Sequence, residues 1–255
     1  MTRRAVPLIP LLLVWLLCAG AAPVRLITNV SQNRIDIIYT FKGAELLVFG
    51  AIEYPPGTVP DEKPGLAIVV RGPAVPITLR KKARVAGVWI NTDSVRFETA
   101  PSFYSVATSA PITALVDERN AAIWEIGLDY LQLSPTGMEV PEVVNAFEAG
   151  LIELRRRAGL YAEHEGAVHV TQNILYQAHI AIPSAVPVGD YAAEIYLIRK
   201  GKVIARATSP IYIGKSGFER WVYVAAHRHG LEYGLGAVAL ALLAGWVASV
   251  AVRRS

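Results

Sequence analysis

The apolar residues of this chain gather at its two ends, and this distribution constrains the fold more than any other feature of the 255-residue sequence. The N-terminal run is short, follows the basic Arg3 and Arg4, and is followed by the small residues Ala19-Gly20-Ala21. A basic start, an apolar stretch and small residues in this order predict a secretory signal peptide over residues 1–21. The alternative is a retained anchor, although the run is short beside the roughly 20 apolar residues of a spanning helix.

The C-terminal apolar run, residues 233–252, contains no charged side chain and is long enough to cross a bilayer as a helix. It is followed by a short stub, residues 253–255, whose arginines the positive-inside tendency places in the cytoplasm. We therefore predict one C-terminal transmembrane helix and a body on the opposite side of the membrane. The predicted anchors at the membrane interface are Trp221, Tyr223, Tyr233, Arg253 and Arg254.

Two further patterns accompany this run. Ser216 and Glu219 form a capping-box pattern, which predicts a juxtamembrane helix over residues 216–230. Small residues then recur at every fourth position, and such a stripe allows a second helix to pack closely. Half of the run is Gly, Ala or Ser, so chance also explains the stripe. The predicted packing residues are Ala237, Ala241, Gly245 and Ser249.

The net charge of +4 reflects the ends of the chain and not its body. Lys and Arg number 25 against 21 Asp and Glu, and the excess equals the four arginines at positions 3, 4, 253 and 254. A balanced body predicts no nucleic-acid partner. The one cysteine, Cys18, lies in the predicted signal peptide, which excludes disulfides and a cysteine nucleophile from the mature chain.

Two β-rich blocks, residues 22–108 and 161–214, flank a helical segment, residues 109–160. Alternating or dense apolar runs separated by Gly and Pro predict the strands, with Gly65–Arg71 as a central strand. In the helical segment, apolar residues at steps of three and four predict a helix over Pro141–Ala158. Between residues 74 and 100 we expect short strands at Pro76–Arg80, Val85–Ile90 and Val95–Glu98.

The expected fold class is mainly β: an immunoglobulin-like antiparallel β-sandwich body, of one sandwich or two, with a helical insertion and the C-terminal transmembrane helix. The stretch from Pro183 to Tyr191 supports it, because a strand ends, the chain turns, and Tyr191 opens an alternating strand. In immunoglobulin-like sandwiches, such a tyrosine donates its hydroxyl back to nearby backbone. The alternative is that Tyr191 is an ordinary core residue.

No catalytic constellation is apparent, so we predict no catalytic residue, no cofactor and no metal. Metal binding needs several imidazoles or carboxylates on one face, and the best candidates are Glu163, His164, Glu165 and His169. The same residues fit equally well as ordinary polar side chains that face solvent. Asp93 is a further carboxylate near a turn.

Several segments together resemble the alphaproteobacterial putative transmembrane protein family. They are Phe41–Ala51, Val69–Pro73, Val85–Val95, Pro101–Tyr104, Val186–Leu197 and Gly217–Trp221. The resemblance implies a bacterial inner-membrane protein whose body faces the periplasm, and a genomic neighbourhood with sulfite-exporter-type permeases. It brings no catalytic residues. Within these segments, the candidate binding surface is Arg71, Trp89, Asn91, Asp93 and Tyr104.

Two functions are consistent with these patterns. The first is a non-enzymatic, inner-membrane-anchored periplasmic protein that acts as an accessory or protein-binding module, with the lipid bilayer and an integral-membrane transporter, such as a sulfite-exporter-type permease, as partners. The alternative is a periplasmic enzyme or metal-binding protein that uses Asp93, Glu163, His164 or His169.

Overall fold

The structure is a computed structural model, and it describes residues 23–37, 42–136, 140–215, 222 and 226–253. The predicted signal peptide, residues 1–21, lies outside the described residues. So do most of the predicted juxtamembrane helix, residues 216–230, and the anchors Trp221, Tyr223 and Arg254.

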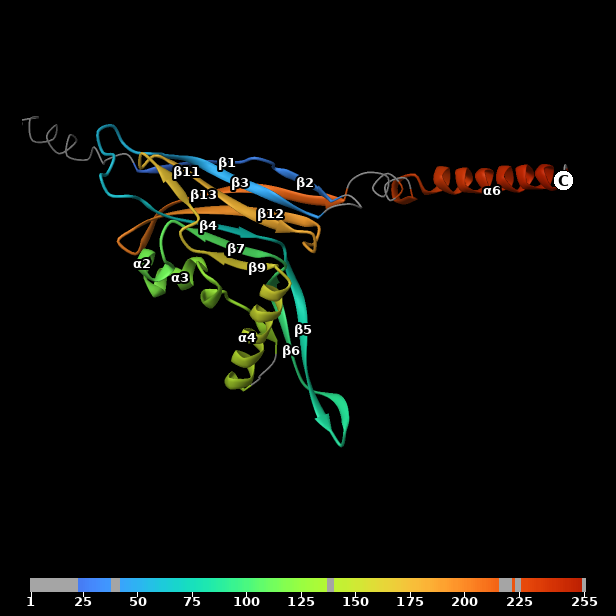
Figure 1. The fold of residues 1–255 in the computed structure, drawn as a ribbon, viewed down its shortest axis with the longest axis horizontal. Coiled ribbons are helices and arrows are strands. Elements are labelled where there is room, and N and C mark those ends of the chain that lie inside the picture. The colour runs from blue at the N-terminus through green and yellow to red at the C-terminus, as the bar shows by residue number, and fades with distance from the viewer. Residues whose placement is uncertain (1–22, 38–41, 137–139, 216–221, 223–225, 254–255) are drawn as a thin grey trace, which may run out of the picture.

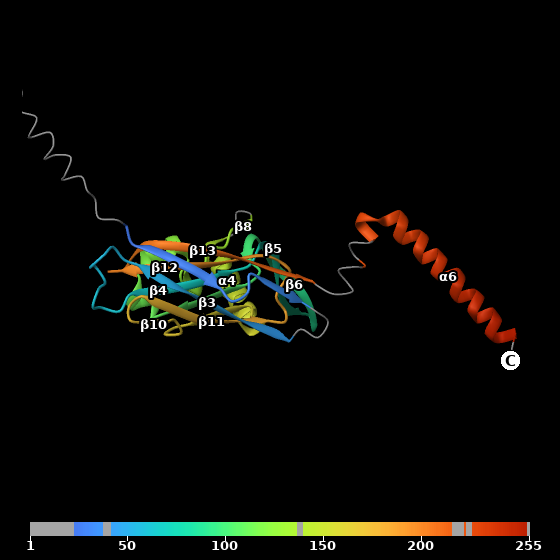
Figure 2. The same cartoon turned by 90° about the horizontal axis from the view of Figure 1, so that it is seen from above.

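Two β-sheets form the body of the molecule (Figures 1 and 2). The four-stranded sheet has the spatial order β1 (Arg25–Val30), β3 (Gly43–Glu53), β11 (Leu175–Pro183) and β10 (His169–Thr171). The six-stranded sheet has the order β2 (Arg34–Ile37), β13 (Lys202–Lys215), β12 (Gly189–Arg199), β4 (Gly65–Arg71), β7 (Tyr104–Thr108) and β9 (Tyr161–His164).

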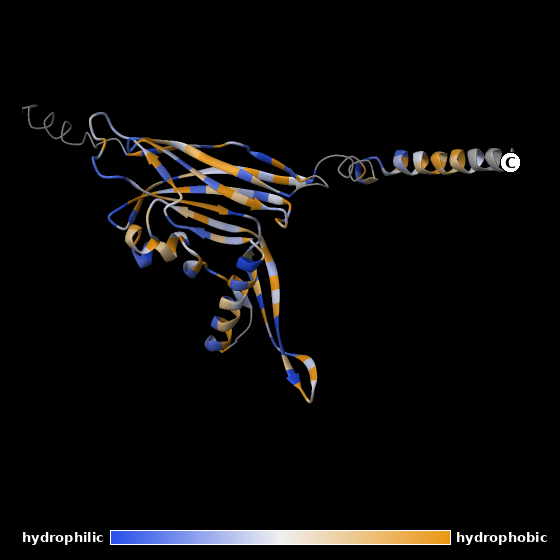
Figure 3. Ribbon diagram, viewed as in Figure 1, coloured by the Kyte–Doolittle hydropathy of each residue, from blue (hydrophilic) through white to orange (hydrophobic). Residues whose placement is uncertain are grey.

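The main hydrophobic core joins residues of both sheets. In β11, every second side chain is buried and those between are exposed, because successive residues of a strand point to opposite faces. Strand β4 instead has five consecutive buried residues, Leu66 to Val70, since it is central and covered on both faces. The prediction of Gly65–Arg71 as a central strand is confirmed, and Figure 3 shows the apolar residues gathered in these strands.

Both β-rich blocks contribute strands to both sheets, so the described body is one sandwich. Two strand pairs depart from the predicted antiparallel arrangement, because β2 pairs with β13 and β7 pairs with β9 in parallel. A parallel pair joins strands that are distant in sequence, which strand periodicity alone does not reveal.

The helical segment supplies three short helices beside the six-stranded sheet, one long helix and one short strand. The predicted long helix is present as α4 (Pro141–Arg157), with Glu142 in its first turn and three arginines in its last. The other elements are α2 (Ile112–Leu115), α3 (Glu118–Trp124), the 3-10 helix η1 (Leu128–Tyr130) and the short strand β8 (Pro135–Thr136).

A long β-hairpin projects from the sandwich next to α4 (Figure 1). Its strands are β5 (Ala74–Val85) and β6 (Val88–Pro101), and with β8 they form a third sheet. Phe147 and Leu151 of α4 share a small second core with Val95, Phe97 and Ala100 of β6. The predicted short strand Val85–Ile90 is wrong: Ala86 and Gly87 both have positive φ and form a two-residue turn there.

The C-terminal residues form a helix, α6 (Gly230–Arg253), with Glu232 in its first turn. Within the part of the chain that the structure describes, however, no helix combines the length and the apolar character of a membrane span. The prediction of a transmembrane helix over residues 233–252 is therefore wrong. That prediction rested on the apolar run of the sequence alone.

Candidate functional site

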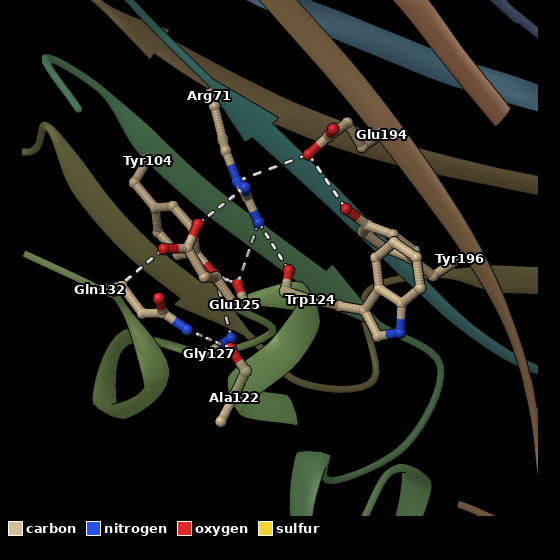
Figure 4. A network of polar contacts seen from close by, with 9 residues as sticks. All are labelled: Arg71, Tyr104, Ala122, Trp124, Glu125, Gly127, Gln132, Glu194 and Tyr196. Carbon is tan, nitrogen blue, oxygen red and sulfur yellow. Dashed lines mark hydrogen bonds and ion pairs between the residues drawn. The ribbon is translucent and has the colours of Figure 1, made fainter. Parts of the chain in front are cut away.

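Arg71, at the end of β4, is the centre of a polar network between the six-stranded sheet and α3 (Figure 4). Its Nη1 lies 2.8 Å from Oε2 of Glu125, and its Nη2 donates to the Trp124 carbonyl at 2.7 Å. Its Nε lies 3.5 Å from Oε2 of Glu194, an ion-pair separation at which the Nε–H makes no hydrogen bond. The guanidinium is therefore held by two carboxylates and a helix end.

The shape of α3 explains why Glu125 reaches Arg71. Asp117 caps the first turn by accepting from the Asn120 backbone N–H at 2.7 Å, and Glu125 ends the helix in the left-handed conformation. A left-handed residue at the end of a helix redirects the chain. The last carbonyls of a helix have no donor within it, so they can accept from other groups. The Arg71 guanidinium donates to the Trp124 carbonyl, and the Tyr104 hydroxyl donates to the Glu125 carbonyl at 2.7 Å.

Tyr104 lies on the buried side of this network. Its hydroxyl also accepts from the Gly127 N–H at 2.9 Å, and the Arg71 guanidinium lies 6.0 Å from its ring centre. Burial raises the pKa of the Tyr104 hydroxyl far above its ordinary value, and burial also raises the pKa of Tyr196, which donates to Glu194. Because these phenols stay protonated and bonded, the network ties α3 to the sheet.

The predicted binding-surface residues lie in two separate places. Arg71 and Tyr104 pair in register on β4 and β7, inside the network just described. Trp89, Asn91 and Asp93 lie on β6 in the projecting hairpin. Tyr104 is fully buried, whereas Trp89 is 67% exposed. The five residues therefore do not form one surface, and the hairpin is the part open to a partner.

A groove of about 700 Å³ lies between the hairpin and α4. Leu79 of β5 and Val143, Ala146 and Phe147 of α4 supply apolar lining, with Leu154 at one side. Charged groups of both signs also line it: Arg80, Lys81, Asp93 and Glu142. Apolar area bordered by charges is the usual composition of a surface that binds another protein segment.

The backbone of β5 is also part of this groove. Four consecutive residues, Thr78 to Lys81, line it, so the groove follows the strand and not only one of its faces. In the third sheet, β5 is an edge strand, because its described pairing is with β6 alone. Edge strands present backbone N–H and C=O groups to which an extended segment can pair.

The carboxylates proposed as metal ligands cap helices instead. Glu165 accepts from the Ile112 N–H of α2 at 2.8 Å, and Glu163 accepts from the Leu128 N–H of η1 at 3.0 Å. A carboxylate at a helix start satisfies a backbone donor that has no partner within the helix. Across residues 23–37, 42–136, 140–215 and 226–253, the structure has no group of three or more His, Cys, Asp or Glu suited to a metal ion.

A second cavity, of about 620 Å³, lies beside the β12–β13 turn and includes His169 in its lining. Its other titratable lining residues are Tyr54, Glu62, Lys63, Arg199 and Lys200. Three cations around one carboxylate disfavour a metal cation at His169. The cavity lining does not include His164 or Glu163.

The candidate packing and anchor residues of the C-terminal region lie on α6 where the structure describes them. Ala237, Ala241 and Gly245 are exposed along the helix, and Tyr233 is in its second turn. The side chains of Ser249 and Arg253 lie outside the described part, as does Arg254.

Sequence reasoning missed Glu125, Glu194 and Gly150. Glu125 and Glu194 meet Arg71 across more than fifty residues of sequence, so no local pattern connects them. Gly150 lines the groove, and a Cβ there would meet open space. The available sequence signal was a glycine inside a helical apolar pattern. Glycine destabilises a helix interior, so its presence there indicates a local role such as leaving space for a groove.

Comparison with known proteins identifies a family. The sequence model of the family described as putative transmembrane protein matches residues 25–254, nearly the whole chain. Neither the curated proteins nor the solved structures include one that matches. The chain thus belongs to the putative transmembrane protein family.

Proposed function

We propose that this protein is a non-enzymatic accessory module that binds a segment of another protein in the groove between α4 and the β5–β6 hairpin. It acts at the bacterial inner membrane with its body in the periplasm, and its partner is an integral-membrane transporter, such as a sulfite-exporter-type permease. The family description supports a membrane location.

The groove is the observation that carries this proposal. It combines about 700 Å³ of space, apolar floor residues and an edge strand. An extended segment can pair with the β5 backbone while its apolar side chains enter the groove. Arg80 and Asp93, of opposite sign, can orient such a segment. The Arg71 network ties α3 to the six-stranded sheet, from which the hairpin projects.

Gly150 offers a sharp test because a side chain there grows into the groove without a clash. Gly150→Phe should fill the groove and abolish co-purification of the integral-membrane partner from detergent-solubilised membranes. Gly150→Ala is the matched control: it should retain the partner and stabilise α4 by about 0.5–1 kcal/mol. Equal partner recovery with Gly150→Phe and with the unmodified protein would show that the groove is not the binding site.

A photo-crosslinking side chain placed at Leu154 gives an independent readout. Leu154 is 59% exposed beside the groove, and Ile123 of α3 is 57% exposed outside it. We expect the transporter to be captured from position 154 and not from position 123. Capture from both positions at equal yield would contradict a specific site.

A further inference from the structure

The tip of the β5–β6 hairpin is apolar on both of its faces. Val85, Val88, Trp89 and Ile90 surround the turn and are 50%, 63%, 67% and 45% exposed. Successive residues of a strand point to opposite faces, so exposure of Val88, Trp89 and Ile90 together means that neither face of the tip is covered. A strand that docks in a protein groove normally needs only one apolar face.

A collar of positive charge follows the tip along β5. It consists of Arg80, Lys81, Lys82 and Arg84. Asp93 is the one acid between residues 80 and 97 of the sequence, and it pairs in register with Lys81. Arg84 donates through Nε to the Gly87 carbonyl at 3.2 Å, which keeps its charge next to the turn. The approach to the tip is therefore strongly basic, and the groove residues Arg80 and Lys81 are part of it.

The order of the apolar tip and the basic collar along the hairpin matches a membrane surface, in which charged headgroups cover an apolar interior. Strand residues rise about 3.3 Å each, so Lys82 lies roughly 10 Å and Lys81 roughly 13 Å behind Val85. Apolar segments that bind a membrane surface enter by about 5–10 Å. With Val88, Trp89 and Ile90 at that depth, Arg80, Lys81 and Lys82 lie toward the headgroup phosphates. Arg84 pairs in register with Trp89, and its long side chain extends toward the phosphates from that level. Tryptophan itself favours this interface.

We propose that the hairpin tip inserts into the surface of an anionic phospholipid bilayer, with the basic collar on the lipid headgroups. Charge complementarity selects lipid as the occupant, because the apolar tip follows a nearly continuous row of cations. The apolar tip lies outside the protein-binding groove, although the basic collar shares Arg80 and Lys81 with it. The membrane contact orients the body so that the groove lies close to the membrane surface.

A fluorescent reporter at the tip tests the insertion. The full-length chain with Cys18→Ala and Val88→Cys carries one environment-sensitive dye, and the protein is reconstituted in phosphatidylcholine vesicles with or without phosphatidylglycerol. We expect a blue shift and quenching by nitroxide-labelled lipids only with phosphatidylglycerol. The matched control carries the dye at Ile204→Cys, an exposed apolar position on β13, and should show neither.

Substitution of the collar residues provides a second test of membrane insertion. Lys81→Gln, Lys82→Gln and Arg84→Gln together should reduce the insertion constant on the order of 100-fold, since each basic residue near an anionic surface contributes about fivefold. Quenching at position 88 no greater than at position 204 would overturn the proposal. Protection of the dye that required an added membrane protein would also overturn it, in favour of a protein partner.

Discussion

Tyr191 connects a local sequence pattern to a tertiary hydrogen bond. Its hydroxyl donates to the Pro187 carbonyl at 2.6 Å, which confirms the predicted bond back to nearby backbone. Its ring is buried and packs against Phe103. The bond closes the turn before β12, so the residue fixes the corner as well as filling core space.

Removal of that hydroxyl should destabilise the body without disturbing its packing. Tyr191→Phe keeps the ring and leaves the Pro187 carbonyl without its donor, which should cost about 1 kcal/mol. The free energy of unfolding in urea measures this loss. Tyr212→Phe on neighbouring β13 is the control, because Tyr212 is exposed, and it should have little effect. Equal stability of the two variants would contradict a structural corner.

The raised pKa of the Tyr161 hydroxyl predicts that the folded protein loses stability at high pH. Burial raises the pKa of its hydroxyl from 10.0 to about 12, and the hydroxyl donates to the Pro101 carbonyl at 2.7 Å. The unfolded chain releases this proton first, so the stabilisation is complete below pH 10.0 and is lost as pH rises to about 12. Urea unfolding at several pH values should show this decline, and Tyr161→Phe should make it shallower. An unchanged slope would contradict the assignment.

At the scale of elements, the β5–β6 hairpin shows what periodicity leaves out. Alternation along residues 74–101 indicates strands, but the apolar residues around positions 85–90 conceal the turn. Ala86 has φ 50° and Gly87 has φ 86°, a pair of left-handed residues that Asn-Gly adopts more readily than Ala-Gly. Ala-Gly is therefore not the preferred sequence for this turn, and the long pairing of β5 with β6 stabilises it.

Two substitutions at this turn should act in opposite directions. Ala86→Asn should stabilise the hairpin by about 0.5–1 kcal/mol, because asparagine tolerates the left-handed region better than alanine. Gly87→Ala should destabilise it by about 1–2 kcal/mol for the same reason. Amide exchange at the in-register pair Lys82 and Asn91 measures both effects. Changes of the same sign would contradict the turn conformation.

At the scale of the whole molecule, the residues that the structure describes form one large core and one small core. The large core joins both sheets, and β3 pairs with β11 across more than a hundred residues of sequence. The small core has five buried residues between β6 and α4. Stability should therefore be uneven, since buried apolar contacts set the cost of local opening.

Hydrogen exchange should resolve this difference. Amides of β4 and β12 should exchange only through global unfolding, whereas those of the distal hairpin and α4 should exchange faster through local opening. Mass spectrometry of peptides from these regions measures the protection. Gly150→Ala should slow exchange in α4 and leave β4 unchanged. Uniform protection across both regions would show that the two cores unfold together.

The sequence by itself determined the features that depend on neighbouring residues. The bounds of β4, the start of α4 and the role of Tyr191 all follow from patterns within a few residues. Local propensity and periodicity carry that information directly.

Only the tertiary structure decided the features that join distant parts of the chain. It placed Arg71 and Tyr104 in a buried network, separated them from Trp89, and gave Glu163 and Glu165 capping roles. It also formed the groove from β5 and α4 and corrected the C-terminal helix. The physical reason is that ion pairs, helix caps and cavities depend on which surfaces meet in space, and no local pattern specifies that meeting.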